Sequence, residues 1–389
     1  MNQLADRINS LSPDKVDLLM KKLKPGKNGS VAATSNGKAV NKKRPFRPLE
    51  DKNYSLQIAK PGLFDTMDLK TCPRRSPGSG EVEIEVHAAG INFRDVMVAL
   101  GSYPTPPGAQ MPAMGVDCAG TIVRVGADVT SAKVGDAVMC MSAGTFSQYV
   151  ITHHACVMPK PENFTFEQAA AIPCVFATVQ FAMIDVGHLR KGESVLIHSA
   201  AGGVGLAAIQ VARAIGAEIF ATVGTPEKRE LMSSMGIQHV FDSRSTSFAD
   251  DILKVTHGKG VDVVLNSLAG DAIQRGFDIL RPLGRFLELG KRDLAANKPL
   301  GMFPFIRGAS FTGIDLALLN PYINPDVSST LYGTLGKLFR DGVYQPLPVR
   351  TYPISDAATA FGYMMQGKHI GKLVLTMPEK GVLVTPSAE

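Results

Sequence analysis

The sequence lacks tryptophan, paired cysteines and long apolar runs, and each absence excludes a class of protein. Its five cysteines, at positions 72, 118, 140, 156 and 174, form no CxxC pair. Neither a disulfide framework nor a thiolate zinc cluster is therefore indicated. No stretch approaches the roughly eighteen apolar residues that a membrane span needs, and the charged first twenty residues do not resemble an export signal. We expect a cytoplasmic protein without a membrane partner.

Positive charge is concentrated at the N-terminus. The formal net charge is +6, and residues 1–50 contain 11 Lys and Arg against 4 Asp and Glu, so the rest of the chain is nearly neutral. A nearly neutral body without interleaved aromatic and basic residues is not typical of a nucleic-acid-binding surface. We therefore expect no nucleic-acid partner.

The first 50 residues are predicted to form an extension outside the core. Apolar residues at mostly helical spacing between residues 3 and 23 predict one or two short amphipathic helices. Residues 25–48 have few apolar side chains and are typical of a flexible linker. The extension is interpreted either as a tether to a larger assembly or as an unstructured tail.

The remaining chain is long enough for two lobes and predicts an α/β protein. Period-2 alternation and turn residues over 51–180 predict a β-rich lobe. Residues 181–320 contain alternating strands and helices, which predict a doubly wound parallel sheet. Residues 321–389 return to mixed character and are expected to rejoin the first lobe. The expected units of the second region are strands over 194–198, 219–223, 261–266 and 285–289 and helices over 203–215 and 227–235, with a final strand over 372–375.

A glycine-rich turn connects the first of these strands to its helix, the position at which such a turn binds a dinucleotide. Small residues let the backbone approach a pyrophosphate, whose charge is stabilised by the N–H groups at the helix N-terminus. The cofactor-binding residues expected here are Ala200, Gly202, Gly203, Val204 and Gly205, with alanine in place of the first glycine of GxGxxG.

The end of the next strand predicts which dinucleotide binds. NAD-selective sites normally carry a carboxylate there, which accepts hydrogen bonds from the ribose. Here the strand ends in Thr222 and is followed by Thr225 and Lys228, with Arg244 further along. Because cations neutralise a 2′-phosphate, we predict NADPH.

Six short segments in this order resemble the medium-chain dehydrogenase/reductase superfamily, and within it the enoyl reductase domains of polyketide synthases and animal-type fatty acid synthases. The segments are residues 90–95, 115–120, 200–205, 266–268, 288–291 and 371–372. The resemblance implies a GroES-like β-rich substrate lobe around a Rossmann domain. It also implies NADPH-dependent reduction of an enoyl thioester on acyl carrier protein, beside other synthase domains, by a monomer or a homodimer. To the cofactor-binding set it adds Asn266, Ser267, Leu268, Gly290, Lys291, Gly371 and Lys372.

The resemblance also implies that no metal takes part. Zinc-dependent members of the superfamily carry a cysteine within the segment matching residues 90–95, and a His-Glu pair where this chain has Val116 and Asp117. The ligands of a catalytic zinc are therefore missing, which disfavours alcohol dehydrogenase chemistry.

Reduction of an activated alkene requires hydride at the β-carbon, a proton at the α-carbon and donors near the developing enolate. Lys291 follows a strand end in the predicted Rossmann sheet, and the resemblance pairs it with Asp315 as proton donors. Tyr103 resembles a tyrosine that governs the protonated face at an α-methyl branch, and Asn92 is expected to face the nicotinamide or the enolate. The alternatives are a structural ion pair, a pocket-lining tyrosine and a turn asparagine.

Three other functions remain open from the sequence. The same scaffold serves free-standing quinone or alkenal reductases, and a non-catalytic NADPH-binding protein would have the same turn. A γ-halogenated substrate would let the carbanion close a cyclopropane instead of taking a proton.

Overall fold

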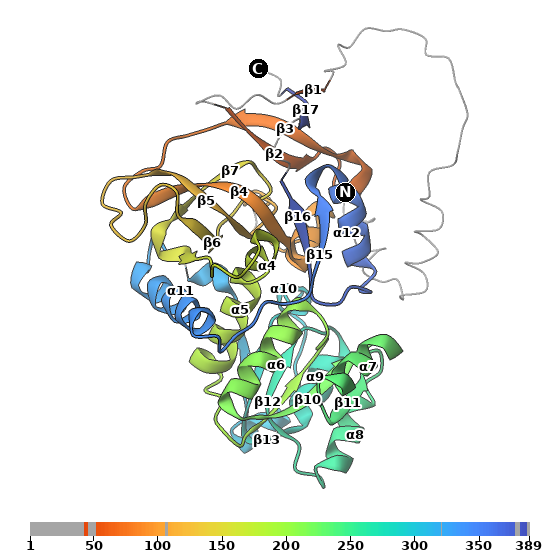
Figure 1. Ribbon diagram of the computed structural model, residues 1–389. Helices are drawn as coiled ribbons and strands as arrows, with labels where there is room; N and C mark the ends of the chain where they lie inside the picture. Colours follow the sequence, from red (N-terminus) through yellow and green to blue (C-terminus); the bar gives the residue numbers. More distant parts are fainter. Residues whose placement is uncertain (1–42, 46–51, 106–107, 320, 378–381, 387–389) are drawn as a thin grey trace, which may run out of the picture.

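The computed structural model describes residues 43–45, 52–105, 108–319, 321–377 and 382–386. The chain forms two lobes, with the N- and C-terminal parts of the sequence in one and the middle in the other (Figure 1). The helices predicted over residues 3–23 and most of the predicted linker lie outside the described residues. Within the described residues, no helix has the length and apolar character that crossing a membrane requires.

The first lobe is built on a seven-stranded sheet in which only β15 and β16 run parallel. In spatial order its strands are β15 (Val349–Pro353), β16 (Lys372–Thr376), β4 (Glu81–Ile91), β5 (Asp117–Val125), β6 (Ala137–Met141) and β8 (Val157–Pro159), with β7 (Tyr149–His153) beside β4. Alternation along β4 buries Val82 and Ile84, as its pattern predicts. Glu83 is also fully buried, because Arg74 and Arg124 both pair with its carboxylate.

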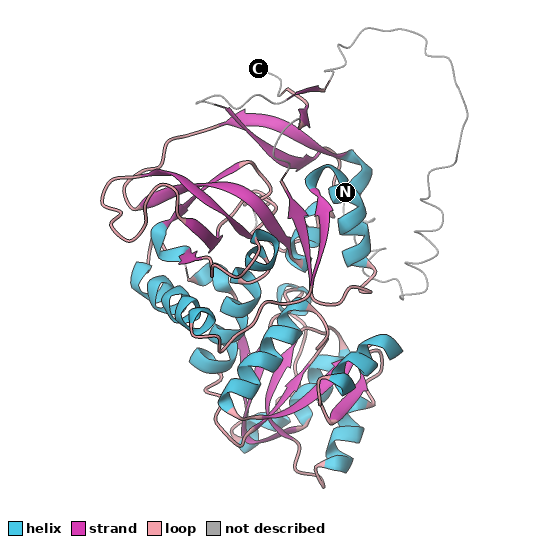
Figure 2. Cartoon of the chain, viewed as in Figure 1, coloured by secondary structure: helices cyan, strands magenta, loops and turns pink. Residues whose placement is uncertain are grey.

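Helices lie below and beside this sheet in the view of Figure 2. They are η1 (Phe64–Thr66), α3 (Phe93–Ala99), η2 (His154–Cys156), α4 (Phe166–Ala170), α5 (Pro173–Val179), α11 (Pro325–Arg340), η6 (Ile354–Asp356) and α12 (Ala357–Met365). A π-helical segment, η3 (Gln180–Val186), continues α5 toward the second lobe.

Two small ribbons lie above the main sheet of this lobe (Figure 1). Strand β2 (Lys52–Ile58) pairs with β3 (Met67–Pro73), and β1 (Arg44–Pro45) pairs with β17 (Leu383–Val384). The prediction of a flexible linker is therefore wrong for residues 44–45. Local composition gave no sign of this pairing, because the partner strand lies near the other end of the chain.

The second lobe is a six-stranded sheet in which every neighbouring pair is parallel, which confirms the predicted Rossmann architecture. In spatial order its strands are β11 (His239–Asp242), β10 (Glu218–Val223), β9 (Ser194–Ile197), β12 (Val261–Asn266), β13 (Leu280–Glu288) and β14 (Ser310–Gly313). Its helical segments are α6 (Gly203–Ile215), α7 (Pro226–Ser234), α8 (Phe248–Val255), α9 (Asp271–Asp278), α10 (Arg292–Ala295), η4 (Phe303–Arg307) and η5 (Leu316–Leu318). The α6 helix ends at Gly216, whose φ of +82° suits a residue without a Cβ atom.

A continuous apolar core joins the two lobes through α5. It extends from Met139 and Met158 of the first lobe, through Val175 and Phe176 of α5, to Val195 of β9. A second connection is made by the backbone, where Gly371 N donates to Ala201 O at 2.9 Å. The lobes are therefore held in a defined relation on either side of the cleft between them.

Candidate active site

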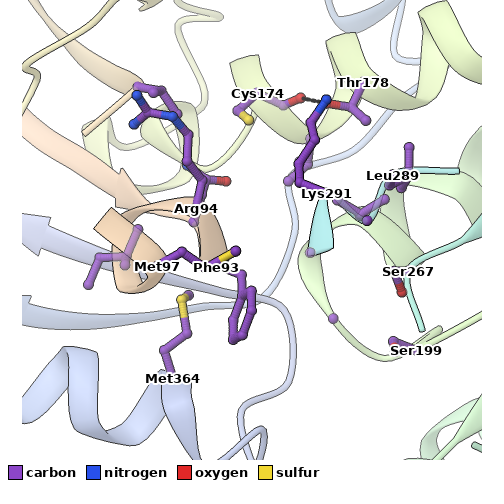
Figure 3. Close-up of a pocket in the computed structure, with 18 of the residues that line it drawn as sticks. Phe93, Arg94, Met97, Cys174, Thr178, Ser199, Ser267, Leu289, Lys291 and Met364 are labelled. Carbon is purple, nitrogen blue, oxygen red and sulfur yellow. Dashed lines mark hydrogen bonds between the residues drawn. The ribbon is translucent and has the colours of Figure 1, made fainter. Parts of the chain in front are cut away.

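A large cleft opens between the lobes, at the carboxyl ends of the parallel strands. Its volume is about 1890 Å³, and residues from both lobes line it. Figure 3 shows Lys291 and Leu289 on one side of this space and Phe93, Met97 and Met364 on the other. In an open α/β sheet this edge is where ligands bind.

The glycine-rich turn forms one wall of the cleft. Gly202, Gly203, Val204 and Gly205 all line it, and Gly202 caps α6 without a side-chain hydrogen bond. A Cβ atom on Gly205 would lie only 2.4 Å from Ala200 Cα, so the tight passage from strand to helix requires glycine there. The first N–H groups of α6 consequently face the cleft without side-chain caps, as an anion site requires.

Three residues predicted to bind the cofactor do not line the cleft. Ala200 is fully buried behind the turn. Thr222 is buried and its hydroxyl lies 2.9 Å from His198 Nδ1, while Asn266 is buried and donates to Glu288 Oε2 at 2.6 Å. Thr222 and Asn266 therefore support the wall from behind, because their side chains are already paired within the protein.

Two cations face the cleft beyond the end of β10. Thr225 caps α7 by accepting a hydrogen bond from Lys228 N at 3.3 Å, and Lys228 and Arg244 both line the cleft. Burial and the charge of Arg244 together lower the pKa of the half-buried Lys228. The Lys228 ammonium donates to Gly367 O at 2.6 Å, which leaves further protons for an anion.

The ends of β12 and β13 are joined by a buried carboxylate. Glu288 accepts hydrogen bonds from Asn266 Nδ2 and from Gly290 N, and so it connects the loop that carries Ser267 and Leu268 to the loop that carries Lys291. Burial raises its pKa to about 7, against the opposing effect of these two hydrogen bonds. Glu288 was not among the predicted site residues, although a carboxylate inside an otherwise buried strand was a signal for a role.

The raised pKa of Glu288 predicts a pH-dependent stability that glutamine would remove. A carboxyl whose pKa is higher in the folded than in the unfolded state stabilises the fold below the unfolded pKa, and that contribution is lost as pH rises toward 7. Between about pH 5 and 7.5 we expect the wild-type protein to lose roughly 2–3 kcal/mol of unfolding free energy that the Glu288→Gln variant does not lose. Urea unfolding across this range measures it, with the exposed Glu230→Gln as control. An unchanged slope in Glu288→Gln would contradict the assignment.

Lys291 and Asp315 come together at the end of the sheet. Lys291 Nζ lies 2.9 Å from Asp315 Oδ2 and donates to Ile314 O at 3.0 Å. Asp315 is itself held because its Oδ1 accepts from Ala317 N at 3.0 Å. Both side chains line the cleft and are only partly exposed, at 25% and 34%. The two predicted proton donors are thus adjacent and face the cavity.

Asn92 belongs to a buried polar network at the opposite wall. Its amide donates to Asp117 Oδ1 at 2.9 Å and accepts from Lys372 Nζ at 2.7 Å. The Lys372 ammonium also donates to Ile91 O and pairs with Asp117 Oδ2, each at 3.2 Å. Its three protons are therefore committed within the protein, and its predicted part in cofactor binding stays a prediction. Direct participation of Asn92 in catalysis stays a prediction.

The mouth of the cleft is lined by aromatic and sulfur-containing side chains. Phe93 is 61% exposed, and Tyr103, Met97 and Met364 lie along the same wall. The Arg94 guanidinium stands 5.2 Å from the Tyr103 ring centroid. Tyr103 thus faces the cavity, as its assigned role requires, and the role itself stays a prediction.

No cluster of metal ligands occurs in the described part of the chain: no three His, Cys, Asp or Glu residues are grouped to hold an ion. Cys174 lines the cleft near Asp117, but burial and that carboxylate raise the pKa of its thiol to about 12.

Most of the predicted site residues therefore share one cavity. Those on its wall are Asn92, Tyr103, Gly202, Gly203, Val204, Gly205, Thr225, Lys228, Arg244, Ser267, Leu268, Gly290, Lys291, Asp315, Gly371 and Lys372.

The chain is similar to proteins of known family along most of its length. Two family models match it: Alcohol dehydrogenase GroES-like domain at residues 78–162 and Zinc-binding dehydrogenase at residues 203–323. It is 43% identical over 336 residues to the mycocerosic acid synthase-like polyketide synthase of Mycolicibacterium smegmatis, and 43% identical over 335 residues to highly-reducing polyketide synthase 1 of Aureobasidium melanogenum. Each match covers 85% of the chain, but only 16% of the first synthase and 15% of the second.

Solved structures resemble the chain over the same region. The CurK enoyl reductase is 37% identical with a TM-score of 0.75, and the CurF ER cyclopropanase from the curacin A biosynthetic pathway is 34% identical with a TM-score of 0.76. Each similarity covers 84% of this chain and 99% of the other.

Proposed function

Because this chain belongs to the medium-chain dehydrogenase/reductase superfamily, and within it to the enoyl reductase domains of polyketide synthases, we propose that it reduces the α,β double bond of an enoyl thioester with NADPH. The chain is an oxidoreductase with a Rossmann-type site for a nicotinamide cofactor. The proposal has three parts: the cofactor is NADPH, the substrate is a thioester on acyl carrier protein, and the reaction does not depend on zinc. The neighbouring synthase domains are proposed as partners, since the chain spans only 16% and 15% of the two synthases that it matches.

The residues on the cleft wall fit NADPH. The N-terminus of α6 would hold the pyrophosphate, and Lys228 with Arg244 would hold the 2′-phosphate. Ser267, Leu268 and Gly290 line the space between the strand ends, where the nicotinamide end would lie. When bound, the reduced cofactor supplies hydride for the β-carbon.

The protein's own side chains would manage the proton. Lys291 would donate a proton to the α-carbon, and Asp315, 2.9 Å away, would orient its ammonium group. Tyr103 would influence which face of the α-carbon is protonated. The Asn92 network holds the facing wall in position, so that substrate is confined between rigid surfaces.

One observation carries this proposal: the glycine-rich turn, the Lys228 and Arg244 cations and the Lys291–Asp315 pair all line a single cavity. No zinc step is needed, because reduction of an activated alkene requires proton and hydride donors rather than a Lewis acid on an alcohol oxygen.

A direct test presents the purified chain with competing substrates. Crotonyl thioesters on acyl carrier protein and on pantetheine, a γ-chlorocrotonyl thioester and a simple quinone are supplied with NADPH or NADH, with and without a strong chelator. We expect preferential NADPH oxidation with thioesters, saturated products by mass spectrometry and no effect of the chelator. A preference for the quinone would overturn the proposed substrate, and closure of a cyclopropane would overturn simple reduction. Activity restored only by zinc would overturn independence from zinc, and no turnover at all would overturn the proposed reaction.

Cofactor preference tests the role of Lys228. We expect Lys228→Ala to raise the Kd for NADPH about 10- to 100-fold, the effect of losing one charge-assisted hydrogen bond, with less than about a threefold change for NADH. Isothermal titration measures both constants, and the exposed Lys254→Ala serves as control. An equal increase of the Kd for both cofactors would mean that Lys228 acts only through its hydrogen bond to Gly367 O.

A further inference from the structure

The segment between α12 and β16 is hydrogen-bonded near both of its ends to residues of the proposed cofactor site. Near its start, Gly367 O accepts a hydrogen bond from Lys228 Nζ at 2.6 Å. At its end, Gly371 N donates to Ala201 O at 2.9 Å, within the glycine-rich turn. His369 lies two residues from each anchor. It is therefore held between the proposed 2′-phosphate site and the proposed pyrophosphate site.

His369 carries a polar atom without a partner. Its side chain lines the cleft, and its Nδ1 atom is buried with no hydrogen-bond partner among the described residues. A buried polar nitrogen left unpaired costs free energy, and such atoms are rare in folded proteins. A ligand bound in the cleft would supply the missing hydrogen-bond partner.

Two lysines from different elements lie close enough to this imidazole to affect its pKa. The positive charges of Lys228 of α7 and Lys372 of β16 both lower the pKa of His369, and Lys368 precedes it in the chain. The charge of Arg244 in turn lowers the pKa of Lys228. Burial and the charges of Lys228 and Lys372 lower the pKa of His369 to about 4, so the ring is neutral at pH 7 in the protein alone.

We propose that His369 binds a phosphate group of the cofactor and takes up a proton from solvent when the cofactor binds. This inference rests on the proposed use of NADPH. Burial is the main cause of the lowered pKa, and an anion placed among these cations offsets the further lowering by Lys228 and Lys372 and accepts a hydrogen bond from the protonated ring. His369 is part of neither the glycine-rich turn nor the cations after β10. It belongs to the loop between α12 and β16, which the C-terminal part of the chain contributes to the site.

The sign of the resulting pH dependence follows from linkage. A group whose pKa rises on binding makes the complex bind more protons than the free protein, so affinity falls as pH increases through the bound-state pKa. The 2′-phosphate acts in the opposite direction, because it loses charge below its second pKa of about 6. Measurement at about pH 7, where this phosphate is mostly ionised, keeps the two effects apart.

Calorimetric titration in buffers with different ionisation enthalpies counts the protons exchanged on binding. For the wild-type chain with NADPH at about pH 7, we expect uptake of a substantial fraction of one proton per site. In His369→Gln we expect uptake to vanish and the Kd for NADPH to rise about tenfold, from one lost charge-assisted hydrogen bond. His154→Gln, a change in the first lobe beside Ser131, is expected to behave as wild type.

The ligands identify which phosphate is bound. Uptake with NADPH and 2′,5′-ADP but not with NADH would assign His369 to the 2′-phosphate, whereas uptake with NADH as well would assign it to the pyrophosphate. NADPH binding without proton uptake by the wild-type chain, or with equal uptake by a folded His369→Gln, would overturn this inference and leave the proposed function intact. Failure of the wild-type chain to bind NADPH would overturn both.

Discussion

Replacing Lys291 by methionine is expected to lower kcat for enoyl thioester reduction about 100-fold or more, the usual contribution of a positioned proton donor. The affinity for NADPH is expected to change less than about threefold, because cofactor phosphates are held by α6 and by the cations after β10. Methionine keeps much of the length of the stem, while removing the ammonium that lies 2.9 Å from Asp315 and 3.0 Å from Ile314 O. Single-turnover NADPH oxidation, with cofactor titration, separates the two quantities.

Lys298→Met is the matched control, because Lys298 is exposed and lies a few residues beyond Lys291 on the same segment. Deuterium incorporation from heavy water at the α-carbon gives a second readout. In Lys291→Met this step is expected to become slow or to lose facial selectivity. A variant with normal kcat and normal stereochemistry would reduce Lys291 and Asp315 to a structural ion pair.

Replacing Lys372 by methionine is expected to destabilise the protein by about 3–5 kcal/mol, the cost of leaving a buried charge without its partner. The Lys372 side chain is 3% exposed and Asp117 is 0% exposed, so water cannot replace the missing ammonium. Methionine retains the apolar stem against which Gly203 packs, where an added Cβ atom would lie 2.7 Å from Lys372 Cδ. The loss is therefore electrostatic, and urea unfolding beside the exposed Lys133→Met measures it.

The pH dependence of this loss identifies its cause. Burial raises the pKa of Asp117 above its ordinary value and Lys372 opposes that rise, so removing Lys372 raises the pKa further. A carboxyl with a raised pKa in the folded state stabilises the fold less as pH increases. The deficit of Lys372→Met is therefore expected to shrink as pH falls from about 7 to 5, and Asp117→Asn is expected to restore part of the stability in the double variant. A deficit that is constant with pH would point to lost packing instead.

Local patterns predicted the second lobe well. The helix Gly203–Ile215 and the strand Val261–Asn266 have the bounds that their patterns predict, because small residues at a strand-to-helix turn and runs of buried residues are signals carried by neighbouring positions. The short strand β11 and the helices α8 and α9 were not among the predicted units. They are only four to eight residues long, so their patterns extend over few positions.

The site was predicted in part. Lys291, Asp315 and Lys228 line the cleft, since a position just past a parallel strand brings a side chain to the ligand-binding edge. Thr222 stands at such an end as well, yet its hydroxyl pairs with His198. Position along a strand decides which edge a residue occupies, whereas its packing partners decide whether its polar atoms remain available.

The sequence by itself determined the two-lobe α/β architecture, the glycine-rich turn and the family, because each depends on residues close together in the chain or on motifs in a fixed order. Only the tertiary structure decided which polar groups are free to meet a ligand. Lys372 is committed to Asn92 and Asp117, 280 and 255 positions away, while the Nδ1 atom of His369 has no hydrogen-bond partner in the part of the chain that the structure describes. Such pairings depend on burial and on contacts between distant segments, which no local pattern of residues contains.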